Sequence, residues 1–147
     1  MGQKMRNIQA KRHQSQWAGQ FLTAGEMIRR GNSVAVCLGN TPTIDLLCES
    51  PNGKPFRVQV KSTSTQVFWL LGKPRKDVYY IFVDITRDGP ARFFIRTGKQ
   101  TLKEWEDREA YHRKLIETRG PRRNLSGIMK KDLVKGKYEG AWGSLPK

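Results

Sequence analysis

The chain has 147 residues, of which 37% are hydrophobic and 10% are aromatic. This length suits one domain with a substantial core, and the composition is that of a globular rather than a disordered chain. Lys and Arg number 28 against 13 Asp and Glu, which gives a formal net charge of +15. A surplus of that size attracts polyanions, most commonly nucleic acid, because neutralised phosphates release condensed counterions.

The cysteines and the apolar runs exclude several classes of protein. Cys37 and Cys48 form no CxxC pair and have no His cluster beside them, so the sequence does not indicate a zinc module. No apolar run approaches the length of a membrane span, and residues 1–13 lack the apolar stretch of a signal peptide. We therefore expect a cytoplasmic protein in a reducing environment.

The N-terminal 30 residues divide into two segments. Residues 1–14 carry several Lys and Arg and no acid, which predicts a flexible basic arm. From Ser15 the pattern predicts an amphipathic helix over residues 15–30 that ends at Gly31. Its expected buried face consists of apolar residues at helical spacing: Trp17, Phe21, Ala24 and Ile28.

Strand signals follow this helix. Residues 33–38, 43–49 and 55–61 read as three strands, the last two joined by a turn over 50–54 that contains Pro, Asn and Gly. Residues 66–71 fit either a short strand or a helical turn. The apolar run 78–85 predicts a strand covered on both faces, with 91–97 as its hairpin partner.

The C-terminal third is predicted to contain a second helix over residues 100–117. A basic segment begins at about residue 119 and holds seven Lys or Arg against one acid between residues 119 and 137. Residues 138–145 include two aromatic side chains and are expected to pack back on the domain. We therefore predict a single domain over residues 15–147.

Polar residues recur on one face of the hairpin formed by residues 43–61. Because side chains alternate along a strand, Asp45 is expected on the face opposite Leu46, and Gln59 and Lys61 on the face opposite Val60. Burial of both apolar faces in one core favours a single register.

That register follows from the five-residue connection over 50–54. It pairs Glu49 with Pro55, Leu47 with Arg57, and Asp45 with Gln59. Lys61 would then lie diagonally from Asp45, at roughly 7–8 Å between Cβ atoms, within reach of its long side chain. An acid, an amide and an ammonium are therefore predicted to converge on one patch.

This combination suits metal-dependent hydrolysis of phosphodiesters. Magnesium prefers hard oxygen ligands, which the Asp45 carboxylate, the Gln59 amide and the Val60 backbone carbonyl could supply. Lys61 could orient or deprotonate a water and stabilise charge on the phosphate. The alternative is an ordinary exposed hairpin in which Asp45 and Lys61 form a pair worth about 0.2–1 kcal/mol.

The same residues carry a family resemblance. The order of a helix containing Gly25-Glu26, a strand, the Asp45 strand and then Gln59-Val60-Lys61 resembles the PD-(D/E)XK, or restriction-endonuclease-like, nuclease superfamily. The resemblance covers residues 21–85. It departs from the family signature at Gln59, where an acid is usual, at Ile44, where the name-giving proline would stand, and after the third strand, where a helix is short or missing.

The resemblance implies an α/β fold with a mixed β-sheet flanked by helices around an α-β-β-β core. It also implies that Asp45 and Gln59 bind Mg²⁺ or Mn²⁺, that Lys61 is the catalytic lysine, and that Glu26 is an auxiliary acid near the metal. Glu26 borders the expected buried arc of its helix, so it could equally be a solvated residue. DNA is the implied substrate, and a homodimer is compatible with cutting both strands.

Basic residues outside the hairpin are candidates for phosphate binding. They lie in the loop after the hairpin and in the basic C-terminal segment, where they could equally form a solvated surface: Lys73, Arg75, Lys76, Arg122, Arg123, Lys130 and Lys131.

The leading hypothesis is therefore a magnesium-dependent endodeoxyribonuclease. A catalytically inactive nucleic-acid-binding module with the same fold explains the charge equally well, and the uncharged Gln59 favours it. A basic protein that docks on ribosomal RNA would explain the charge but not the polar cluster on the hairpin.

Overall fold

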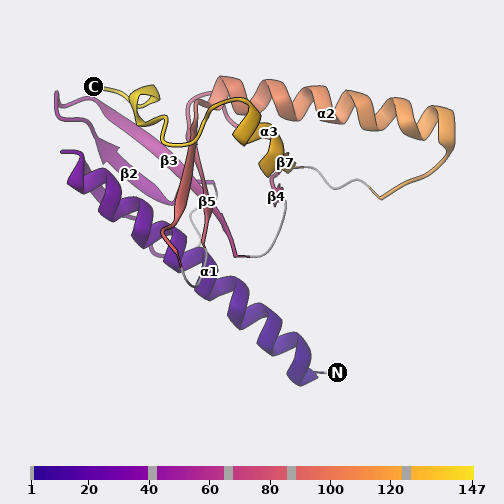
Figure 1. Cartoon of the computed structure of the whole chain (residues 1–147), viewed down its shortest axis with the longest axis horizontal. Coiled ribbons are helices and arrows are strands. Elements are labelled where there is room, and N and C mark those ends of the chain that lie inside the picture. Colours follow the sequence, from indigo (N-terminus) through magenta and orange to yellow (C-terminus); the bar gives the residue numbers. More distant parts are fainter. Residues whose placement is uncertain (1, 40–42, 65–67, 86–88, 124–126) are drawn as a thin grey trace.

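The computed structural model describes residues 2–39, 43–64, 68–85, 89–123 and 127–147, with the side chains of 2–5, 68 and 70 excepted. The described elements follow in chain order (Figure 1): α1 (Gly2–Arg29), β1 (Ser33–Val36), β2 (Leu46–Glu49), β3 (Pro55–Thr63), β4 (Phe68–Leu70), β5 (Tyr79–Asp84), β6 (Arg92–Arg96), α2 (Gly98–Arg119), β7 (Gly127–Met129), α3 (Lys130–Lys135) and the 3₁₀ helix η1 (Trp142–Ser144).

Five of the strands form one mixed sheet in the order β1-β2-β3-β5-β6. β3 and β5 are parallel, and the other three neighbouring pairs are antiparallel. A second sheet pairs β4 with β7. The predicted α/β class, the flanked mixed sheet and the order α-β-β-β are confirmed, as are the hairpin of β5 and β6 and the strand option for part of residues 66–71.

The two faces of the main sheet are covered by different layers. On one face, Val58 and Val60 of β3 belong to a core that includes Ala24 and Met27 of α1. On the other face, Phe82 of β5 belongs to a second core built with residues of β4, β7 and α3. β5 is buried from both sides, as its continuous apolar run predicted. Figure 1 shows α1 along one side of the sheet and α2 leading away on the other.

The segment predicted as a flexible basic arm, residues 1–14, is helical in the part that the structure describes. Residues 2–14 are the first half of α1, which runs without interruption to Arg29. The side chains of residues 6–14 are exposed, and Figure 1 shows this half of the helix extending beyond the sheet. The basic side chains of this segment are therefore displayed on a helix.

The predicted buried face of α1 is also wrong, apart from Ala24. Trp17, Phe21 and Ile28 are exposed, at 37%, 57% and 57% of their surface. The helix instead buries Gly19, Gln20, Thr23, Ala24 and Met27. The physical reason is close approach: a Cβ on Gly19 would lie 2.4 Å from Cβ of Ser62 in β3. A helix can come this near to a strand only on a side with small residues.

α2 confirms the second predicted helix. It begins with a capping box in which Thr97 accepts a hydrogen bond from the Gln100 backbone N–H and the Gln100 side chain accepts one from the Thr97 N–H. Just before it, Arg96 is buried, forms an ion pair with Glu104 and lies 4.4 Å over the ring of Tyr138. These contacts fix the start of α2 against β6.

The C-terminal residues pack back on the main sheet, as predicted. Glu139 forms a β-bridge with Phe94, Trp142 lies 5.4 Å from Phe93 between ring centroids, and Leu145 is buried in the α1-side core. None of the helices in the described part of the chain combines the length and apolar character needed to cross a bilayer.

Candidate functional site

The hairpin of β2 and β3 has the predicted register, but Asp45 lies outside it. Glu49 pairs with Pro55 and Leu47 with Arg57, as expected, and the ladder ends at Leu46 opposite Val58. The backbone N–H of Asp45 also donates to the Val58 carbonyl, at 3.0 Å. Two consecutive residues thus oppose one, which is the arrangement of a β-bulge. The predicted pairing of Asp45 with Gln59 is therefore wrong.

The bulge changes where the Asp45 side chain lies. Its Oδ2 accepts a hydrogen bond from the backbone N–H of Val60 at 2.8 Å, so the carboxylate takes the position of the next ladder carbonyl. Its Oδ1 accepts a hydrogen bond from Nε2 of the buried Gln20 in α1, also at 2.8 Å. Asp45 is therefore held at the edge of β3 by the strand and by the helix.

Gln20 is a residue that sequence reasoning missed. The stripe of Trp17, Phe21 and Ile28 dominated the helical pattern and directed attention to the wrong side of α1. The signal that could have found it is the pair of small residues Gly19 and Ala24, because small residues mark the side of a helix that can approach a sheet closely. Gln20 lies on that side and is the α1 residue that reaches Asp45.

Asp45 and Lys61 influence each other electrostatically. Burial raises the pKa of the Asp45 carboxyl above its ordinary value, while the Val60 N–H and the charge of Lys61 act in the opposite direction. Burial likewise lowers the pKa of the Lys61 ammonium, against the effect of the Asp45 charge. An acid and a base are thus both half-buried beside β3, close enough for each charge to act on the other.

Gln59 lies on the other side of β3 from the α1 core. It is half-buried beside Tyr80 of β5, and its side-chain amide has no hydrogen-bond partner among the residues that the structure describes. Lys61 occupies the same face two residues further on, opposite Phe82. Gln59 and Lys61 therefore share a face as predicted, whereas the Asp45 carboxylate bonds to Gln20 of α1, the helix that covers the opposite face.

Glu26 is not brought to Asp45. Its carboxylate pairs with Arg29 at 3.0 Å and with Arg30 at 3.6 Å. The hydrogen bond from Arg29 lowers the pKa of this carboxyl. Glu26 follows Gln20 by six residues, which on an α-helix is about 9 Å of rise and a different direction around the axis. The α1 contact to Asp45 comes from Gln20 instead.

The predicted phosphate-binding residues have different surroundings. Arg75 binds Asp77 through two hydrogen bonds, and Lys130 pairs with the buried Asp84, so these two cations are already engaged. The other predicted phosphate-binding residues are exposed and available to a polyanion: Lys73, Lys76, Arg122, Arg123 and Lys131.

A metal at this site would rely on neutral oxygens as well as Asp45. Within the described ranges, no group of three or more His, Cys, Asp or Glu side chains could hold a metal ion. Each Asp45 oxygen accepts one hydrogen bond and keeps a second acceptor position. The Val60 carbonyl faces the same edge as its N–H, as in any strand, and the Gln59 amide is unpaired among the described residues. Oxygens of these kinds are ligands that a magnesium or manganese ion with several bound waters would use.

No protein-family model matches the chain, and no curated protein sequence matches it significantly. The class of protein that the fold defines is thus a mixed α/β domain with a five-stranded sheet between helices.

Proposed function

We propose that the protein is a metal-dependent DNA endonuclease with a restriction-endonuclease-like fold. The observation that carries this proposal is that the Asp45 carboxylate and the Lys61 ammonium are both half-buried beside Val60, where the charge of each acts on the pKa of the other. Opposite charges with shifted pKa values are concentrated at functional sites, because chemistry requires groups poised to exchange protons or bind charge.

Asp45, the Val60 carbonyl and Gln59 would hold Mg²⁺ or Mn²⁺, and the bound ion would supply positive charge that polarises a phosphodiester. Gln20 keeps Asp45 in place through the hydrogen bond to Oδ1. Lys61 has the matching role at Nζ: it stabilises negative charge on the phosphate, and its lowered pKa helps it to take a proton from the attacking water.

The charge of the whole chain supports a nucleic-acid substrate. A net charge of +15 accelerates association with a polyanion and makes affinity strongly dependent on salt. The exposed cations of α1 and of the C-terminal segment contribute contacts to phosphates without reading bases.

A second candidate is a nucleic-acid-binding module without catalysis. The observation that favours it is that both oxygens of Asp45 already accept hydrogen bonds inside the domain. In that case Asp45 only completes the ladder where β2 leaves β3. Gln59 adds no charge to attract a metal, which is consistent with this reading.

One assay separates the two candidates. Supercoiled plasmid and branched DNA are incubated with Mg²⁺ or Mn²⁺ and wild-type protein, Asp45→Asn or Lys61→Met. Asp45→Asn keeps the shape and one acceptor for Val60, so circular dichroism should remain native. Lys114→Met, an exposed lysine of α2, is the matched control.

The endonuclease proposal expects metal-dependent cleavage by wild type and by Lys114→Met, reduced at least a hundredfold in the two site variants. Binding to every DNA substrate without cleavage in either metal would contradict it and support the binding module.

A further inference from the structure

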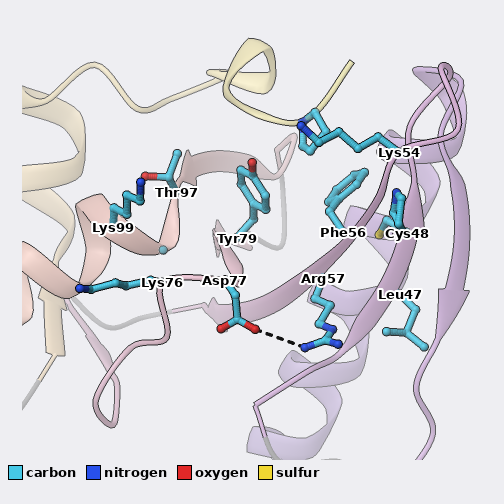
Figure 2. Close-up of a pocket in the computed structure, with 13 residues that line it drawn as sticks. Leu47, Cys48, Lys54, Phe56, Arg57, Lys76, Asp77, Tyr79, Thr97 and Lys99 are labelled. Atoms are coloured by element: carbon cyan, nitrogen blue, oxygen red, sulfur yellow. Dashed lines mark hydrogen bonds and ion pairs between the residues drawn. The ribbon is translucent and has the colours of Figure 1, made fainter.

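A groove lies beside the candidate site, at the ends where β3 and β5 begin. It has a volume of about 840 Å³ and is lined mainly by β2, β3, the loop before β5 and the start of α2. Figure 2 shows Phe56 and Tyr79 between two groups of polar side chains, with Lys76 and Lys99 on one side and Lys54 on the other. The cations at its walls come from four separate segments: Lys54, Arg57, Lys76 and Lys99.

Most of this positive charge is not neutralised. Lys54, Lys76 and Lys99 form no ion pair with any residue that the structure describes. The acid in the lining is Asp77, and it is shared: it bonds to Arg57 at 3.2 Å and to Arg75 at 2.6 Å. Hydrogen bonding to Arg75 lowers the pKa of this carboxyl, which therefore stays charged and leaves Arg57 only partly compensated.

Backbone packing brings together the two segments that carry Lys76 and Lys99. Gly98 at the start of α2 lies so close to the preceding loop that a Cβ there would be 2.2 Å from the Arg75 carbonyl and 2.7 Å from the Lys76 carbonyl. Lys76 and Lys99 are adjacent to this contact in sequence. The groove wall that they form is thus part of the packed structure.

The groove and the candidate site are linked by one face of β3, because Arg57 lines the groove and Gln59 and Lys61 follow it on that face. Arg57, Gln59 and Lys61 alternate on the same face of β3, so Lys61 and Arg57 are about 13 Å apart along the strand. An extended anionic ligand that reaches Lys61 would therefore pass directly to Arg57 and the lysines of the groove.

The aromatic residues of the groove indicate which part of a nucleic acid it would bind. Phe56 is buried, and its ring meets Tyr79 edge to face at 77°, with 5.7 Å between centroids. Because Phe56 is buried, its ring is not available for a base to stack on. The available contacts are cations, which recognise phosphates irrespective of sequence.

We propose that this groove binds the phosphates of the nucleic-acid strand that flanks the position held by Lys61. The identity of the ligand rests on the proposed function, since the polar face that leads from the groove belongs to the same candidate site. The groove makes an electrostatic contact of its own, through Lys54, Lys76 and Lys99, independent of metal.

The test measures binding of a fluorescent single-stranded oligonucleotide by anisotropy in EDTA over a series of salt concentrations. The variant is Lys76→Gln/Lys99→Gln, with Lys114→Gln as control and Lys54→Gln as an independent change on the other wall. Loss of two phosphate contacts should lower the slope of log affinity against log salt by about 1.4 and weaken binding at least tenfold near 0.1 M salt. Lys54→Gln should give about half that change in slope.

The two proposals fail separately. If wild-type protein cleaves DNA and the groove variants bind with the affinity and slope of Lys114→Gln, the groove proposal is overturned while the endonuclease stands. If wild-type protein never cleaves but the groove variants lose affinity and slope, the endonuclease fails and the groove remains a phosphate site.

Discussion

The side-chain amide of Gln20 donates a hydrogen bond of 2.8 Å to Oδ1 of Asp45 and so joins α1 to the point where β2 leaves β3. Gln20 is 97% buried, since only 3% of its surface is exposed. A half-buried carboxylate that loses one of its two hydrogen-bond donors keeps much of its desolvation cost with less compensation.

The first prediction concerns this contact. Gln20→Ala should lower the free energy of unfolding by about 1–3 kcal/mol, measured by urea denaturation. It should also raise the pKa of the Asp45 carboxyl further, because a donor to the charged form is gone. Gln16→Ala, an exposed position one turn earlier, should change stability by no more than about 0.5 kcal/mol. Equal stabilities for the two variants would show that Gln20 does not support Asp45.

The second prediction concerns Gln59. Gln59→Glu adds a negative charge to a half-buried position whose amide has no partner among the described residues. If Gln59 is a metal ligand, this variant should bind Mn²⁺ at least tenfold more tightly than wild type, as titration calorimetry would measure, because a charged oxygen is the stronger ligand.

Its control is the same change in the Asp45→Asn background. There the gain should disappear, because the two oxygens would no longer act on one ion. If Gln59→Glu binds Mn²⁺ with wild-type affinity, Gln59 lies outside any metal site. The same conclusion follows if the gain in Mn²⁺ affinity persists in the Asp45→Asn background.

The hairpin shows how far local patterns reach. Alternation placed Leu46, Val58 and Val60 in the core, and the length of the turn determined the register through Leu47 and Arg57. The bulge at Asp45 was not predictable, because nothing in the local pattern marks one extra residue opposite Val58. The predicted meeting of Asp45 with Gln59 failed for that reason.

α1 shows a different limit. Helical spacing predicted that a helix exists, and it does, but the choice of its buried side depends on which side can approach the sheet. Gly19 permits contact with Ser62, so the small residues face inward while Phe21 and Ile28 face out. Hydrophobicity alone cannot predict a close approach that forms between segments 43 residues apart.

The third prediction tests that approach. Gly19→Ala should destabilise the protein by about 1–3 kcal/mol, because the new methyl group would overlap Cβ and Oγ of Ser62 at 2.4 and 2.6 Å. Gly25→Ala in the same helix should instead stabilise it by about 0.5–1 kcal/mol, since a Cβ there meets nothing within 4 Å. Thermal denaturation of the pair would give opposite shifts in Tm.

Replacing the strand residue provides a rescue. Ser62→Gly removes the overlapping atoms, so Gly19→Ala should cost less in that background than in wild type. If Gly19→Ala destabilises the Ser62→Gly variant as much as it destabilises wild type, the strain does not arise between α1 and β3. Ser62→Gly alone also loses the hydrogen bond of 2.6 Å from Oγ to the Ser15 carbonyl, so the double-mutant cycle, and not the single variants, carries the result.

The last prediction concerns Cys48 and alkaline pH. Burial, with a smaller effect from Cys37, raises the pKa of the Cys48 thiol from 9.0 to about 12. The unfolded chain therefore loses this proton at lower pH than the folded chain does. The stabilising contribution of Cys48 is complete below pH 9 and is lost as the pH rises towards 12, at up to about 1.4 kcal/mol per pH unit.

Between pH 8 and 11, wild type should therefore lose about 2–3 kcal/mol more of its free energy of unfolding than Cys48→Ala does, by urea denaturation under reducing conditions. The cavity left by Cys48→Ala lowers stability at every pH and so does not affect the comparison of slopes. Parallel curves for the two proteins would mean that the Cys48 thiol ionises alike in the folded and unfolded chains. In that case Cys48 would not be enclosed in the core between β2 and α1.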